Sequence, residues 1–559
     1  MSSGNKIMET KSVKIHPDDN LEVALINLKK TEEIGSNGQS YLLHTDVPAK
    51  HKFATADLAP GDDIIMYGVL VGKALKPIKK GELITTNNIT HASGDYKLGE
   101  RKLSFDVPDI SRWRDKTFNG YHRADGSVGI ANYWLVIPLV FCENKNVNVI
   151  QEAFIKELGY QRSSSVYEGQ VNKLVKLYQS GKSSDDLLEA DLNLPEEEDI
   201  SGSKIFPNID GIKFLTHTLG CGGTRQDAEN LCGLLAGYIA HPNVAGATVL
   251  SLGCQNAQIE ILNKEIRKRD ANFSKPLFIL DHQQIGSETK LLQQAIKQTF
   301  VGLAHANQLQ RKPAPLSKLC IGLECGGSDG FSGISANPAV GFLSDLIVAL
   351  GGSVILSEFP ELCGVEQELS DRCVNESIAS KFMQIMALYN AKAKAVGSGF
   401  HANPSPGNIK DGLITDAIKS AGAAKKGGSS PVTAVLDYPE KATKPGLNLL
   451  CTPGSDIEST TAEVGSGATI VLFTTGLGTP TGNPISPVVK ISSNTTLFKK
   501  MNDIIDIDAG TIIDGNETIQ QVGERILDYL IRLASGELKS KAQDSLHDDF
   551  IPWRRDISL

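Results

Sequence analysis

The sequence predicts a multidomain α/β protein that begins with a small all-β domain. Short β segments separated by turns fill the chain up to about residue 92, and strand-like and helical runs alternate from about residue 120 onward. The 559 residues suffice for about three to four domains. A hydrophobic content of 40% and a charged content of 22% are typical of a soluble globular protein.

Residues 13–92 form the predicted all-β domain. Turn-forming sequences at 59–62 and 78–82 separate its strand candidates, which lie at 41–44, 64–68 and 70–74. Residues 93–119 are polar and mixed and show no sustained periodicity, so we expect a linker there.

Residues 120–312 form the first predicted α/β domain. The apolar run from Tyr133 to Phe141 predicts a buried strand that ends at Cys142. A helical pattern covers 228–241, and the acidic segment 185–203 is expected to be an exposed loop. Further strand-like runs lie at 211–215, 247–252 and 276–280.

Residues 313–559 repeat this pattern in a second α/β domain, with buried-strand candidates at 319–323, 353–356 and 468–473. Because strands alternate with helices in both domains, we expect a two-part α/β body with mainly parallel sheets.

The charge pattern and the cysteine content restrict the classes of binding partner and the cellular compartment that we expect. The net charge is −9 and no long basic stripe occurs, which argues against nucleic acid as the main partner. No stretch is long and apolar enough to span a bilayer, and the first residues lack the apolar core of a secretory signal. The nine cysteines are scattered, which favours reduced thiols in a cytoplasmic protein. We expect a homodimer, the commonest soluble assembly.

Four cysteines follow apolar runs directly or closely. They are Cys142, Cys221, Cys254 and Cys325. Ligands of α/β sheets bind beyond the carboxyl ends of the strands, so these thiols are candidate metal ligands, for iron alone or within an iron–sulfur centre. Each of them, taken singly, is better explained as a small buried hydrophobic residue, whereas their equivalent settings after apolar runs make a metal site equally compatible for the group. The absence of a CxxC pair disfavours a zinc finger.

Histidines and polar turns supply the other candidates. His51 is suited to acid–base chemistry, the adjacent Lys52 to pairing with a carboxylate, and His217, shortly before Cys221, is a second acid–base candidate. Candidates for binding substrate are His16, Asp19, Asn20, Ser328, Asp329, Asn403, Ser405 and Thr475. All of these residues also suit surface positions or turns without a function.

Ser328 lies in a Gly-x-Ser-x-Gly pattern after a predicted strand, as the nucleophile of a serine hydrolase would. A nucleophile elbow leads straight into a helix, whereas residues 331–338 are a poor helix start. The hydrolase therefore remains an alternative.

A set of motifs in order along nearly the whole chain carries a resemblance to a known family. The set comprises His16-Pro17, His51-Lys52, Asp125-Gly126-Ser127-Val128-Gly129, Gly220-Cys221, the 324–329 turn with Ala336-Asn337-Pro338, Asn403 to Asn408, and Thr474-Thr475-Gly476 with Gly478-Thr479-Pro480. In these residues the chain resembles the altronate/galactarate dehydratase family. Residues 445–450 and 352–367 look closer to its altronate-specific members.

The resemblance implies an N-terminal SAF (β-clip) domain, a two-part α/β dehydratase body and dependence on a divalent metal. Fe²⁺ is the usual expectation, with Mn²⁺ or an iron–sulfur centre as alternatives. The implied reaction is loss of water from D-altronate to give 2-dehydro-3-deoxy-D-gluconate, in hexuronate catabolism. The alternatives are galactarate dehydration, a related 2-hydroxy-acid lyase, or a sugar-acid binding protein without catalysis.

Overall fold

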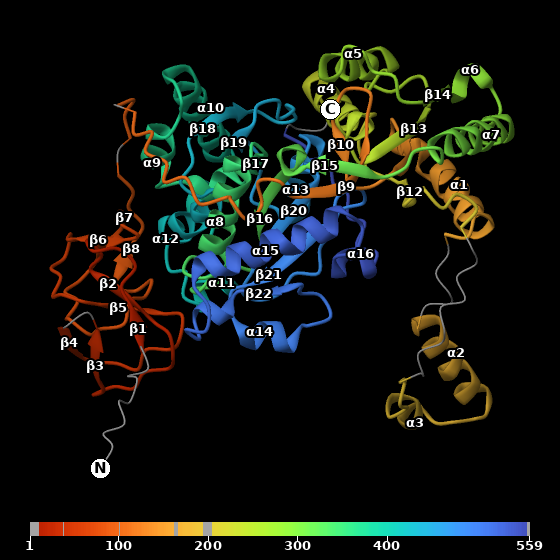
Figure 1. Cartoon of the computed structure of the whole chain (residues 1–559). Coiled ribbons are helices and arrows are strands. Elements are labelled where there is room, and N and C mark those ends of the chain that lie inside the picture. The colour runs from red at the N-terminus through yellow and green to blue at the C-terminus, as the bar shows by residue number, and fades with distance from the viewer. Residues whose placement is uncertain are drawn as a thin grey trace.

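Short antiparallel strands build the N-terminal β domain, in a computed structural model that describes residues 11–36, 39–94, 96–99, 101–160, 166–193 and 204–555. Three small sheets, ordered β1-β2-β5, β3-β4 and β6-β7-β8, make up the domain (Figure 1). Tyr67 and Gly68 both have positive φ, the geometry of a tight two-residue hairpin, and they join β6 to β7. The strands are β1 (Ser12–Val13), β2 (Leu21–Ala24), β3 (Glu33–Ser36), β4 (Gln39–Leu42), β5 (Lys52–Ala54), β6 (Asp63–Met66), β7 (Val69–Ala74) and β8 (Ile89–Thr90).

The predicted linker is held against the C-terminal domain over part of its length. The backbone N–H of Lys102 donates to the Asp371 carbonyl at 2.8 Å, and Trp113, which is 2% exposed, donates its indole N–H to Asp528. The segment therefore connects domains but is also packed.

A four-stranded parallel sheet, ordered β12-β11-β13-β14, forms the centre of the first α/β domain. Every residue of β11 is buried, because α1 and α7 cover one face of the sheet and α4 and α5 the other. The elements are β11 (Tyr133–Pro138), β12 (Gly211–Phe214), β13 (Val244–Ser251), β14 (Leu277–Asp281), α1 (Asn144–Glu157), α4 (Arg225–Ala240), α5 (Ile259–Arg269), α6 (His282–Ile285) and α7 (Glu288–Ala306).

Helices α2 (Val166–Gln179) and α3 (Ser184–Leu188) project away from both parallel sheets (Figure 1). The predicted acidic loop is exposed at its start, but it begins as helix α3 because Ser183 and Asp186 form a capping box. The remainder of that prediction, residues 194–203, lies outside the described residues.

A seven-stranded parallel sheet, ordered β18-β19-β17-β16-β20-β21-β22, forms the C-terminal domain. Helices α8 and α15 pack on one face of this sheet. Its strands are β16 (Cys320–Cys325), β17 (Ser353–Leu356), β18 (Val432–Leu436), β19 (Gly446–Leu450), β20 (Ile470–Thr475), β21 (Val488–Ser492) and β22 (Ile507–Asp508). Its helices are α8 (Ala336–Ala349), α9 (Glu366–Asp371), α10 (Glu376–Ala395), α11 (Pro406–Lys410), α12 (Asp416–Ala423), α13 (Asp456–Gly465), α14 (Thr495–Lys500), α15 (Ile519–Ala534) and α16 (Lys541–Asp544).

Two features join the α/β domains. Helix α4 packs with α13 in one hydrophobic core that contains residues of both parallel sheets. A small antiparallel sheet is formed by β9 (Thr117–His122), β10 (Val128–Gly129) and β15 (Lys312–Pro315), so the boundary predicted at 312/313 lies inside a strand.

The predicted fold class is confirmed: a small β domain precedes an α/β body whose two main sheets are parallel. Among the described residues, none of the helices combines the length and apolarity needed to cross a bilayer.

Candidate functional site

Three of the four predicted metal-binding cysteines meet at the carboxyl edge of the four-stranded sheet. Cys142 follows β11, Cys221 follows β12 and Cys254 follows β13, and these strands are neighbours in the sheet. All three thiols are exposed. Burial, together with the nearby Cys221 and Cys254, raises the pKa of the Cys142 thiol, which shows that the three groups are close enough to interact. We refer to Cys142, Cys221 and Cys254 as the cysteine edge.

A carboxylate–imidazole pair lies beside the cysteine edge. Glu143, which is buried, accepts from or shares a proton with Nδ1 of His282 at 2.8 Å, and Asn146 donates to the other carboxylate oxygen at 2.7 Å. Nε2 of His282 makes no hydrogen bond to any described residue. Glu143 fixes the ring, so Nε2 is left for proton transfer.

His217 has both ring nitrogens engaged by backbone groups, one at the end of β11 and one in its own turn. Nε2 bonds the Pro138 carbonyl at 2.8 Å and Nδ1 accepts from the Leu219 N–H at 3.1 Å. Burial lowers the pKa of His217 to about 4, so it is neutral near pH 7. This geometry suits a residue that holds the turn before Cys221.

Cys325 lies in a different place, at the buried carboxyl edge of the seven-stranded sheet. Its Sγ is 3.1 Å from Oε2 of Glu361 and 3.4 Å from Oε2 of Glu358. Lys426 pairs with Glu358 at 2.8 Å and Lys419 pairs with Glu361 at 2.6 Å. The structure therefore separates Cys325 from the other three cysteines.

The charges around Cys325 balance without a metal ion. Burial opposes the charged form of Lys426, yet Cys325, Glu358 and Glu361 raise its pKa well above the usual value, so it remains an ammonium. Ligand atoms of Cys325, Glu358 and Glu361 lie within 4.8 Å of one another, the spacing of a metal site. Each carboxylate is nevertheless paired with a lysine, and a cation would have to displace it.

Two further buried carboxyls near this cluster have raised pKa values, a shift that favours their protonated forms. Burial raises the pKa of Glu463 to about 8, and burial and Glu358 raise the pKa of Glu324 well above its usual range. Asp456, at the start of α13, titrates near neutrality because burial raises its pKa to about 7.

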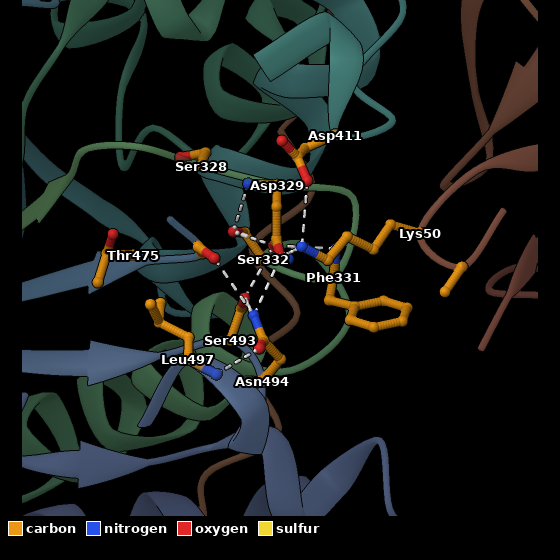
Figure 2. Close-up of polar contacts among 12 residues, drawn as sticks. Lys50, Ser328, Asp329, Phe331, Ser332, Asp411, Thr475, Ser493, Asn494 and Leu497 are labelled. Carbon is orange, nitrogen blue, oxygen red and sulfur yellow. Dashed lines mark hydrogen bonds and ion pairs between the residues drawn. The ribbon is translucent and has the colours of Figure 1, made fainter. Parts of the chain in front are cut away.

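The β domain docks on the C-terminal domain through Lys50, His51 and Lys52. Figure 2 shows Lys50 reaching Asp329 at 3.0 Å and Asp411 at 3.2 Å. The predicted carboxylate partner Lys52 is instead fully buried: its Nζ donates to the carbonyl of Gly412 at 2.6 Å, and burial lowers its pKa to about 7. His51 is half-buried, and burial lowers its pKa too.

Asp329 is buried and fully bonded within the protein. Oδ1 accepts a hydrogen bond from the Ser332 hydroxyl at 3.0 Å and another from the Ser493 hydroxyl at 2.8 Å. Oδ2 forms an ion pair with Lys50 and accepts from the Asn494 amide (Figure 2). Ser328 is also buried, and helix α8 begins only at Ala336, so the strand–turn–helix geometry of a nucleophile elbow is absent here.

The remaining predicted binding residues divide between the Cys325 cluster and local turns. Asn403 bridges Glu361 and Lys419. Ser405 caps α11, and Thr475 accepts from the Gly478 N–H at 2.9 Å.

Asp19 and Asn20 form their hydrogen bonds within the β domain, whereas His16 lines a cavity that Gly333 and Ile334 of the C-terminal domain also line. Asp19 accepts from the N–H groups of His16 and Gly68, and Asn20 bonds the backbone of Asp63 and Ile65. Asp19 and Asn20 thus fix the turns of their own domain.

The charged residues that complete both clusters were not predicted from the sequence: Glu143, His282, Glu358, Glu361, Lys419, Lys426 and Asp456. Three of these residues could have been predicted from their positions. Glu143, His282 and Glu358 follow β11, β14 and β17, just as the candidate cysteines follow their strands.

Three family models match consecutive parts of the chain. They are the altronate/galactarate dehydratase SAF domain over residues 10–92, the D-galactarate dehydratase/altronate hydrolase second domain over 120–307, and the D-galactarate/altronate dehydratase C-terminal domain over 316–558. The expected SAF domain is therefore confirmed.

Curated relatives are similar to this chain over almost its whole length. Altronate dehydratase of Escherichia coli is 34% identical, and that of Bacillus subtilis 33%, each over 94% of this chain and 95% of the relative. Galactarate dehydratase (L-threo-forming) of Escherichia coli is 32% identical over 94% of this chain and 93% of its own length. Three matching domains in one order and these full-length similarities show that the chain belongs to the altronate/galactarate dehydratase family.

Proposed function

We propose that this protein is a hydro-lyase that removes water from D-altronate and gives 2-dehydro-3-deoxy-D-gluconate. Support comes from the two altronate dehydratases, which are 34% and 33% identical over 94% of the chain. The structural observation that best supports an active site for this reaction is the cysteine edge with the Glu143–His282 pair beside it.

The donor set of the cysteine edge fits iron. Three exposed thiols follow adjacent parallel strands, and thiolate sulfur is a preferred ligand of iron. The trio is wider than the groups whose ligand atoms all lie within 4.8 Å, which favours an iron–sulfur centre over a lone Fe²⁺ or Mn²⁺. When bound, the metal would act as a Lewis acid toward the substrate carboxylate and hydroxyl oxygens.

The protein's own contribution is proton transfer by His282. Its Nε2 takes the proton from C2 of the sugar acid, and Glu143 stabilises the resulting imidazolium through Nδ1. The same imidazolium then gives the proton to the C3 hydroxyl, which leaves as water. The enol tautomerises to the 2-keto acid, so the net change is the loss of one water molecule.

Anaerobic purification with iron and sulfide analysis, followed by an assay for 2-keto acid from D-altronate, tests the proposal. We expect iron with inorganic sulfide and turnover of D-altronate above galactarate and other sugar acids. Preferred turnover of galactarate would replace the substrate, and binding of sugar acids without product would favour a catalytically silent binding protein. We also propose that the enzyme acts as a cytoplasmic homodimer, which fractionation and light scattering check.

A further inference from the structure

A third group of potential metal ligands lies between the β domain and the C-terminal domain, next to the Cys325 cluster but sharing no residue with it. It consists of His91, just after β8, Cys363, just after the turn that carries Glu358 and Glu361, and Asp416, the first residue of α12. One ligand atom from each lies within 4.8 Å of the others.

Three separate segments are packed tightly where these side chains meet. Gly364 has a φ of +95°, and a Cβ there would lie 3.1 Å from the Cβ of Ala417 and 3.6 Å from that of Ser93. Gly364, Ala417 and Ser93 thus lie close together, and they bring the segments that carry Cys363, Asp416 and His91 to one place.

The charge of this group differs from that of the Cys325 cluster. Glu366, at the start of α9, lies close enough to His91 and Asp416 to interact with both. Burial raises the pKa of the Cys363 thiol, and the nearby Glu366 and Asp416 raise it further. Among the described residues, the only ion-pair partner of Asp416 or Glu366 is His91. Its Nδ1 forms an ion pair with Asp416, yet this buried atom makes no hydrogen bond to a described residue.

We propose that His91, Cys363 and Asp416 bind a divalent transition metal, zinc by their chemistry. Imidazole nitrogen, thiolate sulfur and carboxylate oxygen are the donors that zinc accepts in tetrahedral structural sites. The ion would neutralise an acidic cluster in which no described lysine or arginine forms an ion pair with Asp416 or Glu366, in contrast to the Lys419 and Lys426 pairs at Cys325.

Such an ion would tie three elements together. His91 closes the β domain, and Cys363 ends the turn that presents Glu358 and Glu361 to Cys325. The site would therefore fix the β domain to the C-terminal domain and brace one side of the Cys325 cluster.

Zinc titration of the chelator-treated full chain, against a chromophoric competitor, tests this inference. The triple variant Cys142→Ser/Cys221→Ser/Cys254→Ser serves as the background, so that the cysteine edge takes up no metal. We expect about one tightly bound zinc per chain in this background, and at least about tenfold weaker binding after Cys363→Ser or His91→Gln. Cys320→Ser is the matched control, since Cys320 is equally part-buried and belongs to neither metal group.

Cobalt supplies an independent readout that does not depend on stability. Co²⁺ should give a thiolate-to-metal charge-transfer band in the background chain, and Cys363→Ser should remove it while Cys320→Ser keeps it. Zinc should also raise the unfolding temperature of the background chain but not that of Cys363→Ser or Asp416→Asn. Equal zinc affinity in the background chain and the Cys363→Ser and His91→Gln variants would overturn the proposal, as would a cobalt band that survives Cys363→Ser.

Discussion

Two histidines are candidates for the proton transfer, and a matched pair of substitutions distinguishes them. His282 is held by Glu143 beside the cysteine edge, whereas His51 lies where the β domain docks. We expect His282→Gln to lower kcat with D-altronate by about 10²–10⁴-fold. His51→Gln should cost about tenfold or less, because it changes only the docked surface. Steady-state kinetics on both variants at equal iron content provide the measurement, and the opposite ranking would assign the base to His51.

The buried Lys52 predicts a pH dependence of stability. Its pKa is about 7 in the folded protein against a usual value of 10.5. Between these values the unfolded chain binds more protons than the folded one, so this group makes stability rise as pH increases from 7 toward 10.5. Lys52→Met should therefore show a smaller rise in the free energy of unfolding between pH 7 and 9. Urea titrations at both pH values check this, and equal slopes for wild type and variant would contradict it.

At the scale of single residues, the sequence could not distinguish the four cysteines. Each follows an apolar run, yet Cys142, Cys221 and Cys254 are exposed and Cys325 is buried. Their grouping depends on strand order: β11, β12 and β13 are neighbours in one sheet, and β16 belongs to another. Strand order arises from packing over long distances in the chain, which local periodicity does not encode.

The glycine-rich turn after β16 makes a prediction at the scale of elements. A Cβ on Gly330 would lie 2.2 Å from the Lys50 carbonyl oxygen, so an alanine there pushes the β domain away. We expect Gly330→Ala to destabilise the protein by about 1–3 kcal/mol and to speed proteolysis between the domains. Gly94→Ala is the control, because nothing lies within 4 Å of that position. Similar unfolding midpoints for both variants would contradict this prediction, because they would show that the contact between Gly330 and Lys50 can move apart without a loss of stability.

Elements themselves were largely predictable, whereas their docking was not. Apolar runs such as 319–323 and 468–473 correspond to β16 and β20, because a strand buried on both faces is apolar throughout. Gly330, in the turn at 326–330, is required by a residue outside the turn: Lys50, far away in the sequence, lies against it. Without that partner, the same turn is compatible with a serine nucleophile.

Across the whole molecule, one hydrophobic core joins the two parallel sheets through α4 and α13, while their carboxyl edges carry different groups. The cysteine edge is exposed and has free thiols. The Cys325 edge is buried, and its carboxylates are paired with lysines. We infer that the first edge serves catalysis and the second stabilises the C-terminal domain next to the docked β domain.

This division of roles predicts opposite effects for two cysteine substitutions. Cys221→Ser should abolish iron binding and turnover, yet change the free energy of unfolding of the iron-free protein by less than about 1 kcal/mol, since the thiol is exposed. Cys325→Ala should retain iron but lose about 2–4 kcal/mol, because it leaves a cavity and removes the contact with Glu358 and Glu361. Anaerobic iron analysis and urea unfolding measure both effects on the same samples. Loss of iron from Cys325→Ala with full retention by Cys221→Ser would move the metal to the seven-stranded sheet, and the proposed proton transfer by His282 would fall with it.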